Sequence, residues 1–481
     1  MADLSVDRAQ TGLKVFIETF GCQMNILDSE LLAERLKIAG HRMVEKNDEA
    51  EVLLYNTCSV RDLSEHKVRS RLGEAKLRKQ KGEKLLVGVI GCMAERAGIE
   101  ILKKNNEIDL LVGPSKIDTI PNLIDELRQK NTKPKQQIAL SDFRVRKGKG
   151  SDLSVTEDLE MLDSLRQLPA GSNKGQAFVR ITRGCNKFCS FCVVPRTRGP
   201  EAHRRPDAIL DEVRRLVDSG IVEVTLLGQT INHYEFSDGA KTTSFADLLY
   251  RIHEEVPHLA RLRFLTSHPR DFTDETLDVM ASSSRICQYL HIPAQSGSNR
   301  ILQAMNRGYT RETYLELIER ARARMPDISI IGDMIVGFPT ETEEDFVASL
   351  DLLKIVKYKN VFVFKYSPRP DTIAHKRFVD DVSVADKKDR NQRMLSLQNE
   401  IALSHHLSMI GRSMDVVVEG EAKISPQLRN GINLAPGMVR LTSRTRGDHI
   451  VSLDGPTSLI GKLVKVEITS GTSLALSGQL I

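Results

Sequence analysis

The alternation of apolar and polar residues divides the chain into regions of different periodicity. In the first region, short apolar runs alternate with longer amphipathic stretches, which predicts strands followed by helices. The expected strands are residues 14–20, 52–55, 85–90 and 109–112. A helix is expected at residues 28–39, with Gly40 as the glycine that ends it. This order predicts an α/β domain with an open parallel sheet, spanning residues 13–130.

Residues 131–175 interrupt this alternation. They contain a glycine-rich run at 171–175 and a basic cluster, Arg144, Arg146, Lys147 and Lys149. For most of this segment we favour a solvated linker.

A second, longer α/β series occupies residues 176–409. Its expected strands are 177–182, 222–228, 261–266, 287–292, 328–336 and 361–366. The clearest helices are 206–219, 311–324 and 341–356, followed by a long one from 386 to about 409. Six β/α units predict a partial (β/α)6 barrel, an open relative of the eight-unit barrel, whose functional loops follow the carboxyl ends of the strands.

Residues 410–481 change to short alternating strands separated by Gly, Pro and Asn. These strands are expected at 414–418, 450–453, 463–468 and 473–476, which predicts a small all-β barrel or sandwich. Within this domain Arg440, Arg444 and Arg446 lie among hydroxyl side chains. Such a segment suits the phosphates of RNA, although a solvated charged face is the commoner explanation.

The composition indicates a globular protein of several domains. Of 481 residues, 40% are hydrophobic and 28% are charged, which is typical of globular domains, and a prior of roughly 150 residues per domain suggests about three. The net charge is only +5, so a nucleic-acid surface must be a local patch. Residues 1–12 lack the apolar core of a signal peptide and no apolar run could span a membrane, so we expect a cytoplasmic protein.

The seven cysteines carry the strongest chemical signal, since an odd number in such a chain favours metal or redox chemistry over disulfides. Cys185, Cys189 and Cys192 have the spacing Cys-x3-Cys-x2-Cys, without a fourth nearby ligand. Three thiolates can hold a [4Fe–4S] cluster and leave one iron open to a small molecule. A zinc knuckle with a remote fourth ligand, or three unrelated buried thiols, are the alternatives.

A second set of thiols is spread over seventy residues. Cys22, Cys58 and Cys92 each follow one of the first three expected strands. The loops after parallel strands gather at one edge of a sheet, so these thiols are expected to converge. Each could instead be a small buried hydrophobic residue, but the same position in three successive units favours a second three-thiolate cluster.

Other candidate residues follow the strands of the central series. Gly228, Gln229, Ser267, Gln295 and Gly337 lie there, where glycine permits close backbone approach to a ligand, although some are ordinary turn residues. Cys287 falls inside an expected strand and is interpreted as a core thiol. No role is assigned to the histidines His268, His291, His405 and His406.

Several sequence blocks resemble the radical S-adenosylmethionine (SAM) methylthiotransferases. They are residues 18–25, 56–61, 191–199, 267–269 and 305–311. The resemblance covers nearly the whole chain and includes a C-terminal domain similar to the TRAM domain. Within the family, the blocks around Cys22 and Cys58 are most similar to the branch that acts on isopentenyl-adenosine in tRNA.

The resemblance implies the cofactors and the reaction. Two [4Fe–4S] clusters are implied, a radical SAM cluster on the closely spaced cysteines and an auxiliary cluster on the dispersed ones. SAM is implied at the first, near the glycine and polar residues named above, and would be cleaved to a 5′-deoxyadenosyl radical. The second would hold the sulfur, which a second SAM methylates before transfer to C2 of N6-isopentenyl-adenosine at position 37 of tRNA. The anticodon stem-loop and an electron donor such as flavodoxin or ferredoxin are the implied partners of a monomer.

Two groups of alternatives remain open. The same cofactors serve methylthiotransferases of a ribosomal protein or of threonylcarbamoyl-adenosine in tRNA, although the blocks around Cys22 and Cys58 disfavour both. A non-enzymatic iron–sulfur or zinc protein that binds RNA is the alternative from another class. Six ligands in two incomplete sets disfavour it, because structural sites normally complete their coordination.

Overall fold

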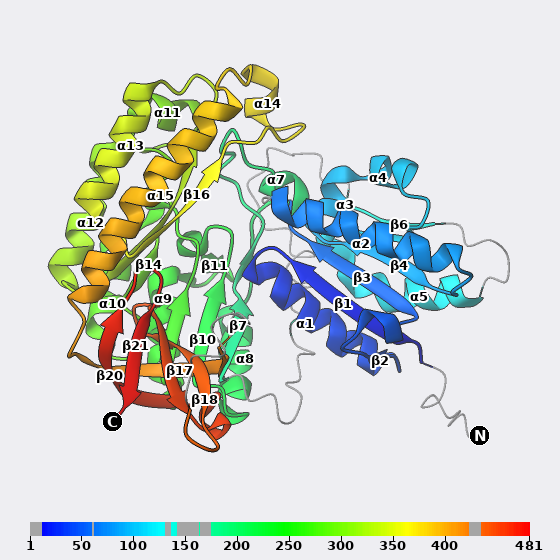
Figure 1. Ribbon diagram of the computed structural model, residues 1–481, viewed down its shortest axis with the longest axis horizontal. Helices are drawn as coiled ribbons and strands as arrows, with labels where there is room; N and C mark the ends of the chain where they lie inside the picture. The colour runs from blue at the N-terminus through cyan, green and yellow to red at the C-terminus, as the bar shows by residue number, and fades with distance from the viewer. Residues whose placement is uncertain (1–11, 60–61, 130–135, 142–162, 164–174, 423–433) are drawn as a thin grey trace. The chain divides into compact units, whose positions relative to one another are not determined.

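The computed structural model describes residues 12–59, 62–129, 136–141, 163, 175–422 and 434–481 (Figure 1). The described residues form two compact units. The first is drawn from Met1–Gln167, Arg183–Asn186 and Cys192–Ala202, and the second from Leu168–Thr182, Lys187–Phe191 and His203–Ile481. The basic cluster at 144–149 and the glycine-rich run up to residue 174 lie outside the described residues. The predicted domain boundaries therefore stay a prediction.

The first unit contains a parallel sheet of six strands in the order β2-β1-β3-β4-β5-β6. The strands are β1 (Lys14–Phe20), β2 (Arg42–Met43), β3 (Val52–Thr57), β4 (Leu86–Ile90), β5 (Leu110–Val112) and β6 (Gln137–Ala139). The predicted open parallel sheet is confirmed. The two edge strands, β2 and β6, were not predicted because two or three residues carry too little periodicity to be recognised.

Helices cover both faces of this sheet. They are α1 (Gln23–Ile38), α2 (Asp62–Gln80), α3 (Cys92–Ala97), α4 (Ile99–Lys104) and α5 (Ile120–Gln129). Adjacent residues of β3 show the arrangement, because Leu53 packs in one apolar cluster with Leu72 and Leu54 in another with Leu32. Helix α1 begins five residues before the predicted start, and Gly40 follows it at a φ of +92° as expected.

The second unit contains six parallel strands, β7 (Gln176–Arg180), β10 (Glu223–Leu227), β13 (Arg261–Phe264), β14 (Tyr289–His291), β15 (Ser329–Val336) and β16 (Asn360–Lys365). They form two sheets, β13-β10-β7 and β14-β15-β16, which a bridge between Leu262 and Ile286 connects. The predicted partial barrel of six units is confirmed.

Long helices alternate with these strands. They are α8 (Pro206–Asp218), α9 (Phe245–Glu255), α10 (Asp274–Ser282), α12 (Arg311–Arg324), α13 (Glu343–Val356) and α15 (Val384–Leu407). Helix α15 packs on β16 and on α13, along the side of the sheet where Figure 1 shows α12 as well. No helix in the described ranges has the length and apolar character that a membrane span requires.

The second unit ends in a closed barrel of five strands in the order β17-β18-β19-β21-β20. They are β17 (Ser413–Glu421), β18 (Val439–Thr445), β19 (Ile450–Gly455), β20 (Leu463–Gly471) and β21 (Leu476–Leu480). The predicted small β-domain is confirmed. The last strand lies further along than predicted, since only Leu476 of the expected 473–476 belongs to it.

This barrel packs against the amino ends of the α/β strands. Arg261, at the start of β13, donates from Nη1 to the carbonyl of Arg444 over 2.9 Å. Lys359, just before β16, pairs with Asp448 at 3.2 Å, and Arg446 donates to the carbonyl of Ile286. The barrel therefore lies at the end of the sheet opposite the loops that follow the strands.

Candidate iron–sulfur and ligand sites

Two glycines bring the first-unit thiols together. Gly21, between β1 and α1, has a φ of +129°, and a β-carbon there would lie 2.2 Å from the β-carbon of Cys58. Gly91, between β4 and α3, has a φ of +88°, and a β-carbon there would lie 2.3 Å from Oδ1 of Asn56. Only glycine permits both the left-handed turn and the close approach.

These turns place Cys22, Cys58 and Cys92 in one site. Cys22 is the residue before α1, Cys58 follows β3, and Cys92 begins α3. The thiol of Cys58 hydrogen-bonds the sulfur of Cys22, and this contact lowers the pKa of Cys22 to about 6 despite burial. Burial raises the pKa of Cys92, and the negative charge of Cys22 raises it further. The predicted convergence of three dispersed thiols is present in the structure.

Two buried asparagines, Asn25 and Asn56, connect the elements that carry the three thiols. Asn25 donates to Oδ1 of Asn56 over 2.9 Å, while Asn56 donates to the carbonyl of Asn25 and to Ser29 Oγ, each over 2.9 Å. Neither asparagine is exposed. Because each donated bond has a fixed partner, the network holds β3 against α1 and fixes the positions of Cys22 and Cys58.

Arg198 adds a buried positive charge to the same site. It follows α7 (Val194–Thr197), and its Nη2 donates to Asp28 Oδ2 over 2.8 Å and to Asn25 Oδ1 over 3.2 Å. Burial opposes this charge, but the nearby Cys92, Asp28 and Cys22 raise the pKa of Arg198 above its ordinary value. Three converging sulfurs with a cation beside them fit an anionic iron–sulfur cluster bound by thiolates.

The second cysteine set lies on the loop between β8 (Thr182–Arg183) and α7. Cys185 and Cys189 are buried and Cys192 is half-buried. Arg307 donates from Nη1 to the sulfur of Cys189 over 3.2 Å, and Asn306 donates to the carbonyl of Phe188 over 3.0 Å. A buried guanidinium directed at this sulfur would offset the negative charge of a cluster bound there.

Orphaned polar atoms gather where the second-unit strands end. In the described part of the chain, Gln229 Oε1, Ser267 Oγ and both ring nitrogens of His268 are buried without a hydrogen-bond partner. Buried polar groups are normally paired, so such a group of atoms fits a polar ligand such as SAM. Two of the five residues predicted to contact SAM, Gln229 and Ser267, therefore have groups available for it.

The other three predicted residues have local structural tasks. A β-carbon on Gly228 would lie 2.2 Å from Thr182 Oγ1, so glycine is needed there for packing. Gly337 has a φ of +70°, and its amide donates to Glu341. Gln295 has a φ of +73°, and its backbone N–H donates to the carbonyl of Asp333, which connects Gln295 to β15. Their contact with SAM stays a prediction.

His268 is a residue that the sequence reasoning left without a role. Burial and the neighbouring Arg307 lower its pKa to about 2, so its ring is neutral at ordinary pH. Beside it, Asp271 pairs with Lys187 at 2.7 Å, and Lys187 belongs to the cysteine loop. The signal that could have identified His268 was its position directly after β13, next to Ser267.

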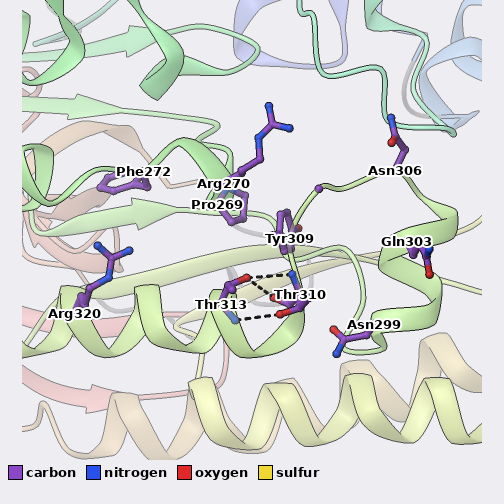
Figure 2. Close-up of a pocket in the computed structure, with 11 residues that line it drawn as sticks. Pro269, Arg270, Phe272, Asn299, Gln303, Asn306, Tyr309, Thr310, Thr313 and Arg320 are labelled. Atoms are coloured by element: carbon purple, nitrogen blue, oxygen red, sulfur yellow. Dashed lines mark hydrogen bonds between the residues drawn. The ribbon is translucent and has the colours of Figure 1, made fainter.

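An open pocket of 720 Å³ lies beside these residues in the second unit (Figure 2). Its lining combines two arginines, three amide side chains and aromatic rings: Arg270, Arg320, Asn299, Gln303, Asn306, Phe272 and Tyr309. Figure 2 shows the reciprocal bonds of Thr310 and Thr313 that begin α12 at its edge. Amides, guanidinium groups and aromatic faces are the groups that bind unpaired nucleotides.

The three arginines predicted to contact RNA have carboxylate or carbonyl partners within the protein. Arg440 pairs with Asp454 on the neighbouring strand. Arg444 pairs with Glu419 at 2.8 Å and Asp448 at 3.0 Å. Arg446, as described above, bonds a backbone carbonyl in the adjoining α/β core. Contact of these arginines with RNA stays a prediction.

Cys287 and the remaining histidines behave as structural groups. The Cys287 thiol is 1% exposed and packs with Tyr289 and Ile331, as expected of a core residue. His406 hydrogen-bonds His449 at 3.1 Å, and so connects α15 with the C-terminal barrel. His291 lies 3.1 Å from the carboxylate of Asp333.

The chain matches two family models. Residues 179–353 match the radical SAM superfamily, and residues 14–113 match the uncharacterized protein family UPF0004. The first match covers the partial barrel from its first strand to α13, with the cysteine loop, and the second covers strands β1 to β5 of the sheet that carries Cys22, Cys58 and Cys92.

Curated relatives match over nearly their full length. The tRNA-2-methylthio-N(6)-dimethylallyladenosine synthase of Moorella thermoacetica is 40% identical over 97% of this chain and 98% of its own. The protein of the same name from Parabacteroides distasonis is 40% identical over 97% and 95%. Among solved structures, the radical SAM methyltransferase TsrM of Kitasatospora setae, with cobalamin and a [4Fe-4S] cluster, has a TM-score of 0.54 at 16% identity, over 76% of this chain and 74% of its own. This likeness concerns the fold alone.

Proposed function

The chain belongs to the radical SAM methylthiotransferases, among the tRNA-2-methylthio-N(6)-dimethylallyladenosine synthases, and we propose that its two cysteine sets divide the reaction of that family between them. It is an enzyme that transfers a methylthio group to C2 of N6-isopentenyl-adenosine in tRNA, with SAM and [4Fe–4S] clusters as cofactors. The observation that carries the proposed division is the convergence of Cys22, Cys58 and Cys92 beside a buried cation.

The cofactors supply the chemistry that side chains cannot. Cys185, Cys189 and Cys192 would hold a cluster that, with SAM, would supply a carbon-centred radical, and Cys22, Cys58 and Cys92 would hold a cluster that would supply the sulfur. The C2–H bond of adenine is not acidic enough for a general base to remove the proton. The protein's own side chains therefore bind and orient the reactants and balance the charge of the cofactors.

The protein's own residues prepare these sites. Arg307 and Arg198 each place a guanidinium at a thiol, which would offset the negative charge of a bound cluster. Gln229, Ser267 and the neutral ring of His268 offer unpaired polar atoms to SAM, since burial makes an unmet hydrogen bond costly.

For the RNA, the pocket shown in Figure 2 is proposed to accept an unpaired nucleotide of the anticodon loop. Two of its lining residues, Asn306 and Gly308, flank Arg307, whose side chain bonds the radical-site sulfur, so a nucleotide there would be close to the reacting end of the sheet. Gln303 is exposed and Arg270 is half-exposed, so changing them to alanine should leave the fold intact. The double variant should weaken binding of an anticodon stem-loop and leave SAM cleavage without RNA unchanged.

The remaining assignments extend the proposal. The enzyme is proposed to work as a cytoplasmic monomer that receives electrons from flavodoxin or ferredoxin. Position 37 of tRNA is the proposed target, because that adenosine lies in a single-stranded loop from which a base can leave its stack.

Replacing each cysteine set separately tests the proposed division. The variant with alanine at Cys22, Cys58 and Cys92 should keep one cluster and still cleave reduced SAM to 5′-deoxyadenosine, without a methylthio product on an isopentenylated stem-loop. The variant with alanine at residues 185, 189 and 192 should make neither 5′-deoxyadenosine nor product. Iron counts and mass spectrometry of the RNA measure these outcomes, with unmodified stem-loop as the substrate control. Methylthiolation by the first variant would disprove the division.

A further inference from the structure

Arg198 brings a buried guanidinium to the three-thiol site. The side chain is only 3% exposed, and its Nη2 is committed to Asp28 and Asn25. In the described part of the chain its buried Nη1 finds no acceptor within hydrogen-bonding distance and angle, although the guanidinium interacts with the Cys92 thiol. A buried guanidinium N–H without an acceptor is costly, so a complete site should contain one.

The geometry around Asn25 shows where that acceptor lies. Oδ1 of Asn25 accepts from the sulfur of Cys22 over 3.2 Å and from Nη2 of Arg198 over 3.2 Å. The guanidinium and the Cys22 thiol therefore share one acceptor atom. Among the thiols, Cys92 contributes the largest favourable charge to Arg198. The unused N–H is thus part of the three-thiol site.

The charge of the site indicates the kind of acceptor. Asp28 is 1% exposed and already balances the single positive charge of Arg198. If Arg198 only held α1 in place, its ion pair with Asp28 would be sufficient. A further N–H donor beside the thiols of Cys22 and Cys92 would then have no purpose. A soft anionic acceptor at the site would use both the spare N–H and the favourable potential.

We propose that Nη1 of Arg198 donates a hydrogen bond to an anionic sulfur at the site formed by Cys22, Cys58 and Cys92. That sulfur is either an inorganic sulfide of the bound cluster or the sulfur destined for transfer. The proposal rests on the proposed function of this site and adds a positioning residue to it. Hydrogen bonds to cluster sulfurs raise a reduction potential, so the bond has a measurable consequence without RNA or turnover.

The experiment uses the full-length chain with alanine at residues 185, 189 and 192, so that only the auxiliary cluster is present after reconstitution. Arg198→Lys keeps the charge and removes the planar fork. Arg96→Lys is the matched control, because Arg96 lies in the same unit and its Nη2 is satisfied by both oxygens of Glu65. Iron content, reduction potential and the affinity for added sulfide and methanethiolate are measured for each protein.

A bond to a cluster sulfide predicts a more negative reduction potential for Arg198→Lys at unchanged iron content. A bond to the transferable sulfur predicts an unchanged potential with roughly tenfold weaker binding of sulfide or methanethiolate, as for the loss of one charge-assisted hydrogen bond. Arg96→Lys should change neither quantity. If Arg198→Lys resembles this control in both, the proposal is wrong.

A second measurement keeps Arg198 itself, so that the proposal can be tested even if Arg198→Lys loses its cluster. The same protein is prepared with ¹⁵N-labelled arginine, and pulsed electron paramagnetic resonance of the reduced cluster is recorded with and without sulfide. A ¹⁵N coupling supports the bond, and its absence in both states overturns the proposal. Failure of the wild-type protein, with all six cysteines of both sets, to methylthiolate tRNA would contradict the proposed function, whereas this coupling in the variant would leave the proposed bond intact.

Discussion

Arg307 and Cys189 lie 118 residues apart in the chain, yet Nη1 of Arg307 donates to the sulfur of Cys189 over 3.2 Å. Its other nitrogens are held by Tyr309 Oη and the carbonyl of Pro293, each over 2.9 Å. The guanidinium is therefore fixed in place before any cofactor binds. One side chain thereby joins the loop after β14 to the cysteine loop.

This fixed contact predicts that Arg307→Lys impairs the radical site while the fold survives. The lysine keeps a charge but cannot reproduce three directed bonds, and loss of such a supporting contact typically costs about 10- to 100-fold in metal affinity or activity. The measurement is 5′-deoxyadenosine formation together with iron content. Arg300→Lys is the control, since Arg300 is half-exposed and bonds Thr340 and Asp345 instead. Cys189→Ala marks complete loss, and wild-type 5′-deoxyadenosine from either Cys189→Ala or Arg307→Lys would refute the assignment.

Cys287 is predicted to be dispensable for both clusters. Its thiol packs with the core side chains of Tyr289 and Ile331, so Cys287→Ala should keep the full iron content. The loss in free energy of unfolding should be about 1–2 kcal/mol, for the removal of one buried sulfur. Iron analysis and urea unfolding test this together. A drop in iron equivalent to one cluster would show that Cys287 is a ligand.

Arg440 and Arg444 are predicted to differ although they lie on the same strand. Arg440 has one carboxylate partner, Asp454, so Arg440→Gln should weaken tRNA binding for all sequences and flatten its salt dependence. Arg444 is held by two carboxylates, so Arg444→Gln should chiefly lower the stability of the barrel. Binding measured at several salt concentrations, alongside urea unfolding, distinguishes them. An unchanged salt slope for Arg440→Gln would mean that this segment is a solvated face.

His449 predicts a loss of stability in mild acid. Burial, with Lys359, His405 and His406 nearby, lowers its pKa to about 2 from an unfolded value of 6.5. Below pH 6.5 this histidine binds a proton in the unfolded chain but not in the folded chain. Its contribution to the free energy of unfolding is therefore complete above pH 6.5 and is lost as the pH falls below that value. For this histidine alone, the loss in the free energy of unfolding between pH 7.5 and 5.5 is on the order of 1 kcal/mol. Urea unfolding at both pH values should show a smaller drop for His449→Gln than for the wild type, and equal drops would contradict this account.

The sequence by itself determined the elements and their class. Strand and helix periodicity are local properties, so runs such as 14–20 and 328–336 could be predicted without the fold. The spacing of Cys185, Cys189 and Cys192 is local too, which is why this ligand set could be proposed directly. Even Cys22, Cys58 and Cys92 were accessible, because parallel strands bring the loops after them to one edge.

The tertiary structure decided which distant side chains complete the sites. Arg198 and Arg307 lie far along the chain from Cys22 and Cys189, and no periodicity connects an arginine with a sulfur that it meets only after folding. The same holds for Arg444, whose charge suggested a free surface until Glu419 and Asp448 were found beside it. Pattern and spacing fix local geometry, whereas the pairing of buried charges depends on how complete elements pack, and only the folded chain supplies that information.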